Sequence, residues 1–515
     1  MALANLINTK DFSKKRVLLV LCFVILFFVT RVPRLQNDII NPDGVNWHYR
    51  SQMFMNGLKY HNLVLTYQHY HPGVTLMWIT APPIELFRHI PGNDKYDMYN
   101  FIGFDFIAKF ALINAQLLIT ILLIFFLSKI LGFYESLGVI TLLSLEPFFL
   151  GNSRLFHLDI LLTLLMFLSI TTFYLSVKFE SKLFYLLTGI FLGLSFLTKT
   201  VSITLVFFLL LVLAGKGLFT KSIKKNVLYA SILFFAFCVT VFVLFPALWV
   251  RPVYFILNLF TEGYRVGVKN GHEVVVLGDT QEEGGLLFYP LALLVKISPL
   301  LLFGFAGYVT LFFKNIKKDM FSLIILGFYL FYFLVMCVPS KKLDRYMLVL
   351  FPMFALYTAL FFKSIFIKYQ KRIRIVASIF VLGAFIFIVY PLIKLFPYYF
   401  TYSSPLVGSA ENANKLIGQK PFGVGMYDLK EFILDKYGYY PKLGFIDVKP
   451  MESIYPNRLV FDLRTFAVED YDLAILGPNE EFSNRVKRSP YKLVKDSSIY
   501  INGLEYWRIY VKEHK

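Results

Sequence analysis

Residues 14–50 read KKRVLLVLCFVILFFVTRVPRLQNDIINPDGVNWHYR and hold the first apolar run of the chain, 16–30. No small-residue cleavage site follows this run, since Thr30 is followed by Arg31, Val32 and Pro33. We therefore interpret it as a retained membrane anchor and not as a signal peptide. The anchor would deliver Asp43 to the headgroup level on the far side of the bilayer.

The rest of the chain repeats this apolar pattern. Of its 515 residues 57% are hydrophobic and 18% are aromatic, and the mean hydropathy is +0.62. A soluble protein of this size does not carry so many uninterrupted apolar runs. The sequence predicts a polytopic α-helical membrane protein with about eleven transmembrane helices, at 16–30, 106–128, 134–150, 160–177, 183–198, 200–214, 227–245, 291–313, 320–337, 345–362 and 374–393.

The net charge of +19 follows from the membrane topology, so it gives no reason to expect a nucleic-acid partner. Residues 397–515 are nearly neutral, with 16 Lys and Arg against 15 Asp and Glu. The excess lies beside alternate runs, which is the positive-inside pattern. We expect an integral protein of the cell membrane with a cytoplasmic N-terminus and an extracytoplasmic C-terminal domain. The basic residues include Lys14, Lys15, Lys129, Lys178, Lys182, Lys221, Lys224, Lys225, Lys314, Lys317, Lys318, Lys363 and Lys368.

Two domains are expected. Residues 1–396 form the membrane domain, whose long outer loops are 31–105 and 246–290, and residues 397–515 form a small α/β domain. Strands are predicted at 422–427, 442–448 and 472–476, with a hairpin at 498–511 and helices at 428–437 and 480–488. The three cysteines lie in or beside apolar runs, which indicates packing and neither a disulfide framework nor a metal site.

Charged residues at the outer ends of the apolar runs are the candidate functional groups. Asp43 and Asp159 are carboxylates, and a carboxylate can accept a proton from an attacking hydroxyl. Lys341, Lys342 and Arg345 depart from the positive-inside pattern, which favours binding of a phosphate over a stop-transfer anchor or an Asp344–Arg345 surface pair. This set suits transfer of a group from a lipid phosphate to an acceptor.

Several short segments carry a family resemblance. They are NPDGVNWHYRSQMF (41–54), YQHYHPGVTLMW (67–78), RLFHLDILLTLL (154–165), GLSFLTKTVSITL (193–205), GHEVVVLGDTQEEGGLLFYPLALLVKISPL (271–300) and SKKLDRYMLVLFPMFAL (340–356). In this order they resemble the membrane glycosyltransferases of the GT-C fold, which include the dolichyl-phosphate-mannose-protein mannosyltransferases and the aminoarabinose transferases of lipid A.

The resemblance implies roles for individual residues. Asp43 matches the first-loop acid that activates or orients the acceptor, and Asp159 matches the second acid. The carrier phosphate is expected on Lys341, Lys342 and Arg345, with His71 at a position where some relatives place a lysine. The acceptor or its loop is expected to be supported by Arg154, His69 and His272.

No cofactor follows from the sequence with certainty. Many relatives have an acidic pair in the first loop, but here Gly44 stands beside Asp43, which speaks against a divalent metal. The chain also lacks the glycine-rich loops of nucleotide-binding proteins.

The predicted function is therefore an inverting single displacement, in which a polyprenyl-phosphate sugar donates its sugar to a protein, lipid or glycan acceptor on the outer face. One alternative is a transporter or flippase of lipid-linked glycans, although transporters more often place their charges near the midplane. A glycan ligase or polymerase is another alternative, since it shares the carrier-phosphate site.

Overall fold

The computed structural model describes residues 13–269 and 273–514. Within these ranges eight helices are long and apolar enough to cross a membrane, or ten if each of two bent pairs is one span. The eight helical segments are Lys14–Asn37, Phe101–Ser128, Asp159–Phe179, Thr200–Phe219, Ile223–Leu244, Met320–Cys337, Asp344–Lys368 and Ala377–Leu395. The bent pairs are α6 (Phe133–Leu145) with α7 (Pro147–Ser153) at 73° and α14 (Phe288–Lys296) with α15 (Pro299–Leu311) at 116°.

Every predicted apolar run has a helix in the structure, which confirms a polytopic helical membrane protein. The predicted run 183–198, which is not among these ten, corresponds to α9 (Lys182–Thr198), an apolar helix of 17 residues. The other long elements are α2 (Lys14–Arg31), α5 (Phe101–Ser128), α8 (Asp159–Phe179), α10 (Ile203–Phe219), α11 (Ile223–Leu244), α17 (Met320–Cys337), α18 (Phe351–Lys368), α19 (Ile373–Ala384), η8 (Phe385–Val389) and α20 (Tyr390–Leu395).

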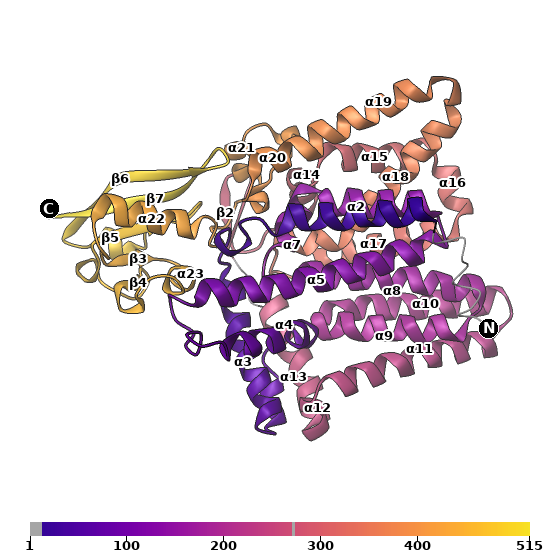
Figure 1. Ribbon diagram of the computed structural model, residues 1–515, viewed down its shortest axis with the longest axis horizontal. Coiled ribbons are helices and arrows are strands. Elements are labelled where there is room, and N and C mark those ends of the chain that lie inside the picture. The colour runs from indigo at the N-terminus through magenta and orange to yellow at the C-terminus, as the bar shows by residue number, and fades with distance from the viewer. Residues whose placement is uncertain (1–12, 270–272, 515) are drawn as a thin grey trace.

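The basic turns between spans meet at one end of the helix bundle. Lys363 at the end of α18 pairs with Glu135 in α6 at 2.9 Å, and Lys225 in α11 pairs with Glu180 after α8 at 2.5 Å. The start of α2 lies at the same end, since the Lys15 ammonium is 5.9 Å from the ring of Tyr134. The C-terminal sheet lies at the opposite end (Figure 1).

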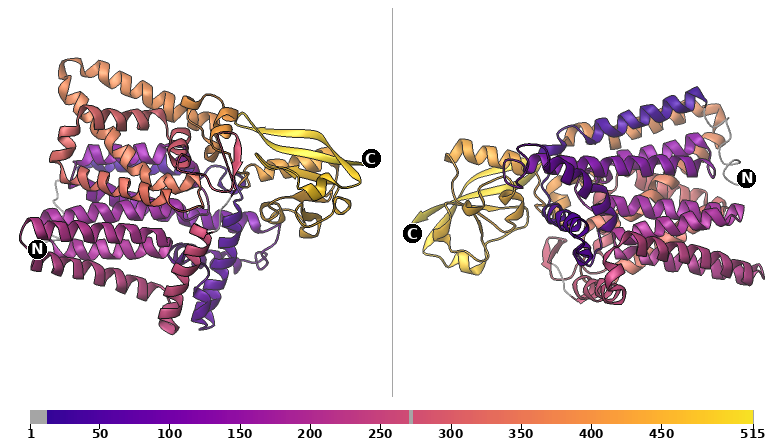
Figure 2. Two further views of the ribbon diagram at one scale, coloured as in Figure 1. Left: turned by 180° about the vertical axis from the view of Figure 1, so that it is seen from behind. Right: turned by 60° about the horizontal axis from the view of Figure 1, so that its bottom comes forward.

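The first long outer loop contains two helices that are separate from the membrane-spanning helices. This loop forms α3 (Pro42–Lys59) and α4 (Val74–Arg88), and Figures 1 and 2 show α3 running across the direction of the long helices. The second long loop forms α12 (Ala247–Val250), α13 (Pro252–Tyr264), a π-helix (Arg265–Lys269) and the hairpin β1 (Val274–Val276) with β2 (Asp279–Gln281).

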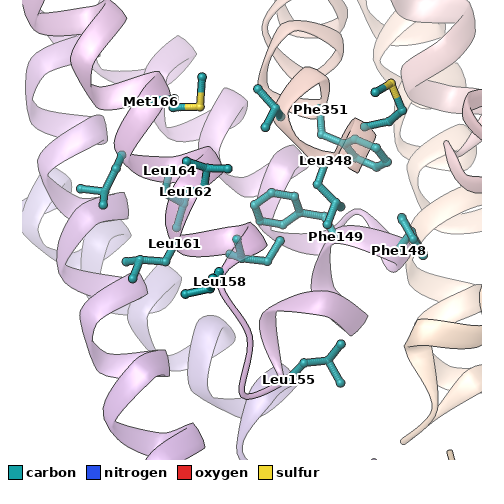
Figure 3. Close-up of a cluster of buried hydrophobic side chains, with 14 of the residues drawn as sticks. Phe148, Phe149, Leu155, Leu158, Leu161, Leu162, Leu164, Met166, Leu348 and Phe351 are labelled. Atoms are coloured by element: carbon teal, nitrogen blue, oxygen red, sulfur yellow. The ribbon is translucent and has the colours of Figure 1, made fainter. Parts of the chain in front are cut away.

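A buried apolar cluster joins three segments that are far apart in sequence. Phe148 and Phe149 of α7 face Phe351 at the start of α18, with ring centroids 6.2 and 6.4 Å apart (Figure 3). Leu158 and Leu348 are buried in the same region. The cluster therefore fixes the start of α8 against η6 (Asp344–Leu350), the two places that carry Asp159 and Arg345.

The C-terminal domain contains a five-stranded mixed sheet of order β4-β3-β5-β7-β6. Strands β3 (Leu443–Phe445), β4 (Val460–Asp462) and β5 (Leu473–Leu476) are parallel, whereas β6 (Tyr491–Ile501) and β7 (Leu504–His514) form an antiparallel hairpin. This confirms the predicted α/β class and the hairpin around Asn502 and Gly503. The boundary at residue 397 stays a prediction.

Two local predictions in this domain were wrong, and one strand was missed. Residues 422–427 are not a strand, because Phe422, Gly423 and Gly425 have φ angles of 50°, 69° and 65° and α22 (Met426–Tyr437) begins at once. The predicted helix 480–488 shortens to α24 (Asn484–Lys487), and β4 was not predicted. The remaining short helices are α21 (Ala410–Leu416) and α23 (Lys449–Glu452).

Candidate active site

Local sequence places Asp43 in the first turn of α3. Asn41 is the N-cap and accepts a hydrogen bond from the Gly44 amide at 2.6 Å, and Pro42 occupies the first helical position, where a missing N–H costs nothing. The Asn41 amide also donates to the carbonyl of Phe156 at 3.2 Å. The cap therefore fixes the first turn of α3 beside the segment that carries His157.

Five side chains meet next to this turn, and we call them the charge cluster: Asp43, His157, Asp159, Lys199 and Arg345. The Asp43 Oδ2 lies 2.7 Å from the Arg345 guanidinium and 3.2 Å from His157 Nε2. The Asp159 Oδ2 lies 3.0 Å from His157 Nδ1 and 3.3 Å from Arg345 Nε. The Asp159 Oδ1 accepts a hydrogen bond from Lys199 at 2.8 Å. The two carboxylates thus share two bridging side chains, His157 and Arg345.

His157 bridges the two carboxylates, since each of its ring nitrogens faces a carboxylate oxygen. Arg345 and Lys199 balance the charges of the two carboxylates, and Lys341 lines the cavity beside them. The additional positive charge of Lys341 suits an anionic ligand.

Asp43 is the exposed member of the cluster, with 41% of its side chain accessible, whereas the Asp159 side chain is 6% accessible. Its partly buried position alone would raise the pKa of the Asp43 carboxyl, but Arg345 and His157 outweigh that effect and hold the pKa well below its usual range. An ionised carboxylate of this kind accepts hydrogen bonds readily but is a weak base. The contacts described above all engage Oδ2, so Oδ1 is oriented for a further donor.

A cavity of about 310 Å³ opens beside the charge cluster. One part of its wall is polar and includes Asp159, Lys199, Lys341 and Arg345, together with Tyr70 and Tyr346. Another part is apolar. It is formed by Leu162, Val201, Ile203, Leu259, Phe260, Met336 and Val349. A phosphate headgroup and the first part of an apolar tail match these two surfaces.

The three basic residues predicted for the phosphate do not behave alike. Lys341 and Arg345 line the cavity. Burial lowers the pKa of Lys341, while Asp43 opposes that shift. Lys342 points elsewhere: its ammonium donates to the carbonyls of Cys337 and Pro339 at 2.7 and 2.9 Å, near the end of α17. Lys342 does not line this cavity, because its side chain satisfies a helix terminus, and its contact with the carrier phosphate stays a prediction.

Two histidines of the first loop, His69 and His71, lie at the cavity: His71 lines it, and the His69 ring is 5.6 Å from the His71 ring. Burial and the neighbouring Lys199 keep the pKa of His71 well below its ordinary value, so His71 offers a neutral ring to the cavity. Burial and Arg50 lower the pKa of His69 to about 3. The contact of His71 with the carrier phosphate stays a prediction. His69 was predicted to support the acceptor or its loop, and that role stays a prediction too. His272 lies outside the described residues.

Arg154 supports the loop that leads to Asp43. Its guanidinium is buried, pairs with Asp38 at 2.9 Å and donates to the carbonyls of Arg31 and Pro33, each at 2.9 Å. Asp38 also pairs with Lys109 of α5 at 3.0 Å. This network matches the predicted role of loop support, and it is separate from the cavity wall given above.

Sequence reasoning missed two members of the cluster, Lys199 and His157. Lys199 ends α9 and Asp159 begins α8, and the two helices are antiparallel neighbours joined by a short turn. Residues at the open ends of such a hairpin meet, so the lysine in GLSFLTKT could have been paired with the aspartate. His157 is one of eight histidines in the chain, and nothing in the sequence singled it out.

No group of three or more His, Cys, Asp or Glu side chains suited to a metal ion occurs among the described residues. His157 separates the two carboxylates of the cluster, and Arg345 contacts both. The residues present therefore do not form the donor set of a divalent cation.

Comparison with known proteins identifies the fold class of the chain. A family model described as dolichyl-phosphate-mannose-protein mannosyltransferase matches residues 104–245. The solved structure of ArnT from Cupriavidus metallidurans bound to undecaprenyl phosphate aligns at a TM-score of 0.51, with 14% identity over 96% of this chain and 97% of that chain. The archaeal oligosaccharyltransferase AglB from Archaeoglobus fulgidus, in complex with an inhibitory peptide and a dolichol-phosphate, aligns at 0.54, with 12% identity over 90% and 69%. No curated protein matches this chain in sequence.

These similarities confirm the GT-C fold that the sequence segments implied. The chain is an integral membrane protein of the architecture that ArnT and AglB share. The family-model match covers α5 to α11, the part that contains Asp159, His157 and Lys199.

Proposed function

We propose that this protein is a glycosyltransferase that moves a sugar from a polyprenyl-phosphate donor to an acceptor at the outer membrane surface. The observation that carries the proposal is that Asp43 contacts Arg345, which together with Asp159 lines a cavity that is also lined by apolar side chains. Similarity to ArnT bound to undecaprenyl phosphate and to AglB bound to a dolichol-phosphate supports it.

The donor phosphate is assigned to Lys341, Arg345 and Lys199, which line the cavity together. Arg345 and Lys199 already neutralise the two carboxylates, and Lys341 adds positive charge beside them. The first isoprene units would then lie against apolar residues of α8, α10 and α13, including Leu162, Ile203 and Leu259. Charge and shape thus fit a phosphate ester at the end of a lipid tail.

Asp43 is assigned to bind the acceptor substrate. Because its pKa is low, the Asp43 carboxylate accepts a hydrogen bond from the hydroxyl or amine of that substrate and orients it, but it does not keep the proton. The acceptor atom bonds to the anomeric carbon while the bond from that carbon to the phosphate oxygen breaks. The acceptor's proton then passes to the departing phosphate, whose second pKa is about 6. One in-line displacement inverts the anomeric configuration.

Transfer from labelled polyprenyl-phosphate sugars in proteoliposomes tests the proposal, with parallel lanes that contain a chelator. Asp43→Asn is the test variant. Asp462→Asn is the matched control, since Asp462 is a carboxylate on β4 that pairs with Arg464 at 2.7 Å. Label should leave the lipid with the wild type and the control but not with Asp43→Asn. Export of intact donor without transfer, unaffected by Asp43→Asn, would instead identify a transporter.

The placement of the charge cluster on the extracytoplasmic side of the plasma membrane is part of the proposal. It is supported by the meeting of the basic turns at the end of the bundle opposite the C-terminal sheet. A membrane-impermeant thiol reagent tests it on a chain whose three cysteines are replaced. A cysteine at Asn502 should be labelled from outside intact cells, and a cysteine at Lys221 should not.

A further inference from the structure

The segment Lys420–Gly425 of the C-terminal domain lies against the charge cluster, and we call it the docking segment. Its Gly423 carbonyl accepts a hydrogen bond from the Ile40 amide at 3.2 Å, and its Gly425 amide donates to the Asp38 carbonyl at 3.3 Å. Ile39 and Val424 form an antiparallel bridge. These contacts end one residue before Asn41, the N-cap of the helix that carries Asp43.

The docking segment is held from behind by the C-terminal sheet. On β7, the Tyr506 hydroxyl donates to the carbonyls of Lys420 and Pro421 at 3.1 and 3.0 Å, and the Trp507 indole donates to the Val424 carbonyl at 2.9 Å. A continuous set of hydrogen bonds therefore links the sheet to the first turn of α3.

Phe422 extends this link to the cation of the cluster. The Arg345 guanidinium carbon lies 4.7 Å from the centre of the Phe422 ring, and the other neighbour of that ring is Phe400, stacked at 4.9 Å and 15°. An aromatic face attracts a guanidinium and shields its ion pairs from water. Phe422 also has a φ of 50°, a left-handed conformation that bulky residues adopt where their surroundings impose it.

Lys420 brings a further cation to the same place. Together with Arg345 and Phe422 it lines a small cavity next to the large one, with Lys342 and Asp344 on the opposite wall. Burial and the neighbouring Arg345 lower the pKa of Lys420 to about 8. The C-terminal domain thus adds both an aromatic face and a titratable amine beside the cluster.

We propose that Phe422 is a positioning residue of the candidate active site, and that the docking segment makes the C-terminal domain a working part of that site. Phe422 holds the Arg345 guanidinium between Asp43 and Asp159, while Gly423 and Gly425 hold residues 38–40 and so the first turn of α3. The role of Phe422 in sugar transfer rests on the proposed function. The coupling between the docking segment and residues 38–40 does not.

Gly423→Ala tests the coupling without reference to any activity. A Cβ atom at Gly423 would lie 1.9 Å from the Ile40 carbonyl oxygen, so the docking segment and residues 38–40 must separate. Gly438→Ala is the matched control: Gly438 lies in the same domain with a φ of 88°, but a Cβ there meets nothing within 4 Å. Both substitutions cost left-handed strain, and only one opens the contact.

Hydrogen exchange read by mass spectrometry on the full-length chain in detergent gives the result. In Gly423→Ala the amides of residues 38–48 should exchange at least about tenfold faster than in the wild type, and in Gly438→Ala they should not change. Equal exchange of residues 38–48 in the two folded variants would overturn the coupling, as would unchanged exchange in Gly423→Ala.

Phe422→Leu and Phe422→Tyr then test the positioning role in the transfer assay. Leucine keeps an apolar side chain but removes the π face, so kcat should fall about tenfold with little change in donor KM, and tyrosine should restore most of the rate. Equal rates for leucine and tyrosine would contradict the role assigned to the ring. If the wild type transfers no sugar at all, the proposed function fails, and the exchange experiment still decides the coupling.

Discussion

Lys199→Met tests how much the buried ion pair between Lys199 and Asp159 contributes to the free energy of unfolding. The two groups are 2.8 Å apart and each side chain is 6% exposed. Removing one partner of a buried pair costs ~3–5 kcal/mol, because the other charge stays buried without compensation. Asp159 would keep His157 at 3.0 Å and Arg345 at 3.3 Å, so we expect the lower end, about 3 kcal/mol.

The free energy of unfolding, measured by titration with a denaturing detergent, is the assay. Lys225→Met is the matched control, because Lys225 forms a solvent-exposed pair with Glu180 at 2.5 Å, and its loss should lower the free energy of unfolding far less. Adding Asp159→Asn to Lys199→Met should recover most of the lost stability, since no buried charge is then left unpaired. The reasoning is refuted if Lys199→Met costs no more than Lys225→Met, or if the double variant is as unstable as the single one.

Four further predictions rest on the cluster and the cavity. Lys341→Met should weaken binding of a polyprenyl phosphate by about tenfold, as measured by lipid-dependent thermal stabilisation, because Lys341 lines the cavity. Lys342 does not line it, so Lys342→Met should leave this affinity unchanged and lower the melting temperature instead. Asp43→Asn should abolish transfer but retain this lipid-dependent stabilisation, since Asp43 lies beside the cavity wall; loss of lipid binding would contradict that placement. The depressed pKa of Asp43 stabilises the folded protein above the unfolded pKa of about 3.9, and this stabilisation is lost only as the pH falls below that value. Asp43 therefore stays ionised above about pH 4, and its titration should not lower the rate of transfer there. In Arg345→Lys the shorter reach should raise the pKa of Asp43 and move the acid limb of the pH–rate profile upward; an unchanged limb would contradict the role of Arg345.

The fold was largely predictable because apolar runs and basic turns report directly on membrane crossing. The same physics placed Asp43, Asp159 and Arg345 at one membrane surface, and the structure brings these three into contact. Lys342 could not be separated from Lys341, since adjacent residues diverge according to local backbone geometry that hydropathy does not contain.

The C-terminal domain was predicted less well, for a different physical reason. Gly423 and Gly425 interrupt an apolar sequence that looks like a strand, and their left-handed backbone is set by contact with residues 38–40, almost 400 positions away. A pattern read along the chain cannot contain a contact of that separation. The partnership of Phe422 with Arg345 is hidden for the same reason.

A structure of the protein with a bound, non-transferable polyprenyl phosphate tests the central claim most directly. We predict that the phosphate lies against Lys341 and Arg345, that the lipid tail follows Leu162, Ile203 and Leu259, and that the Asp43 carboxylate faces the side of the phosphate where the sugar would be attached. A phosphate bound away from Arg345, or separated from Asp43 by the protein core, would contradict the account.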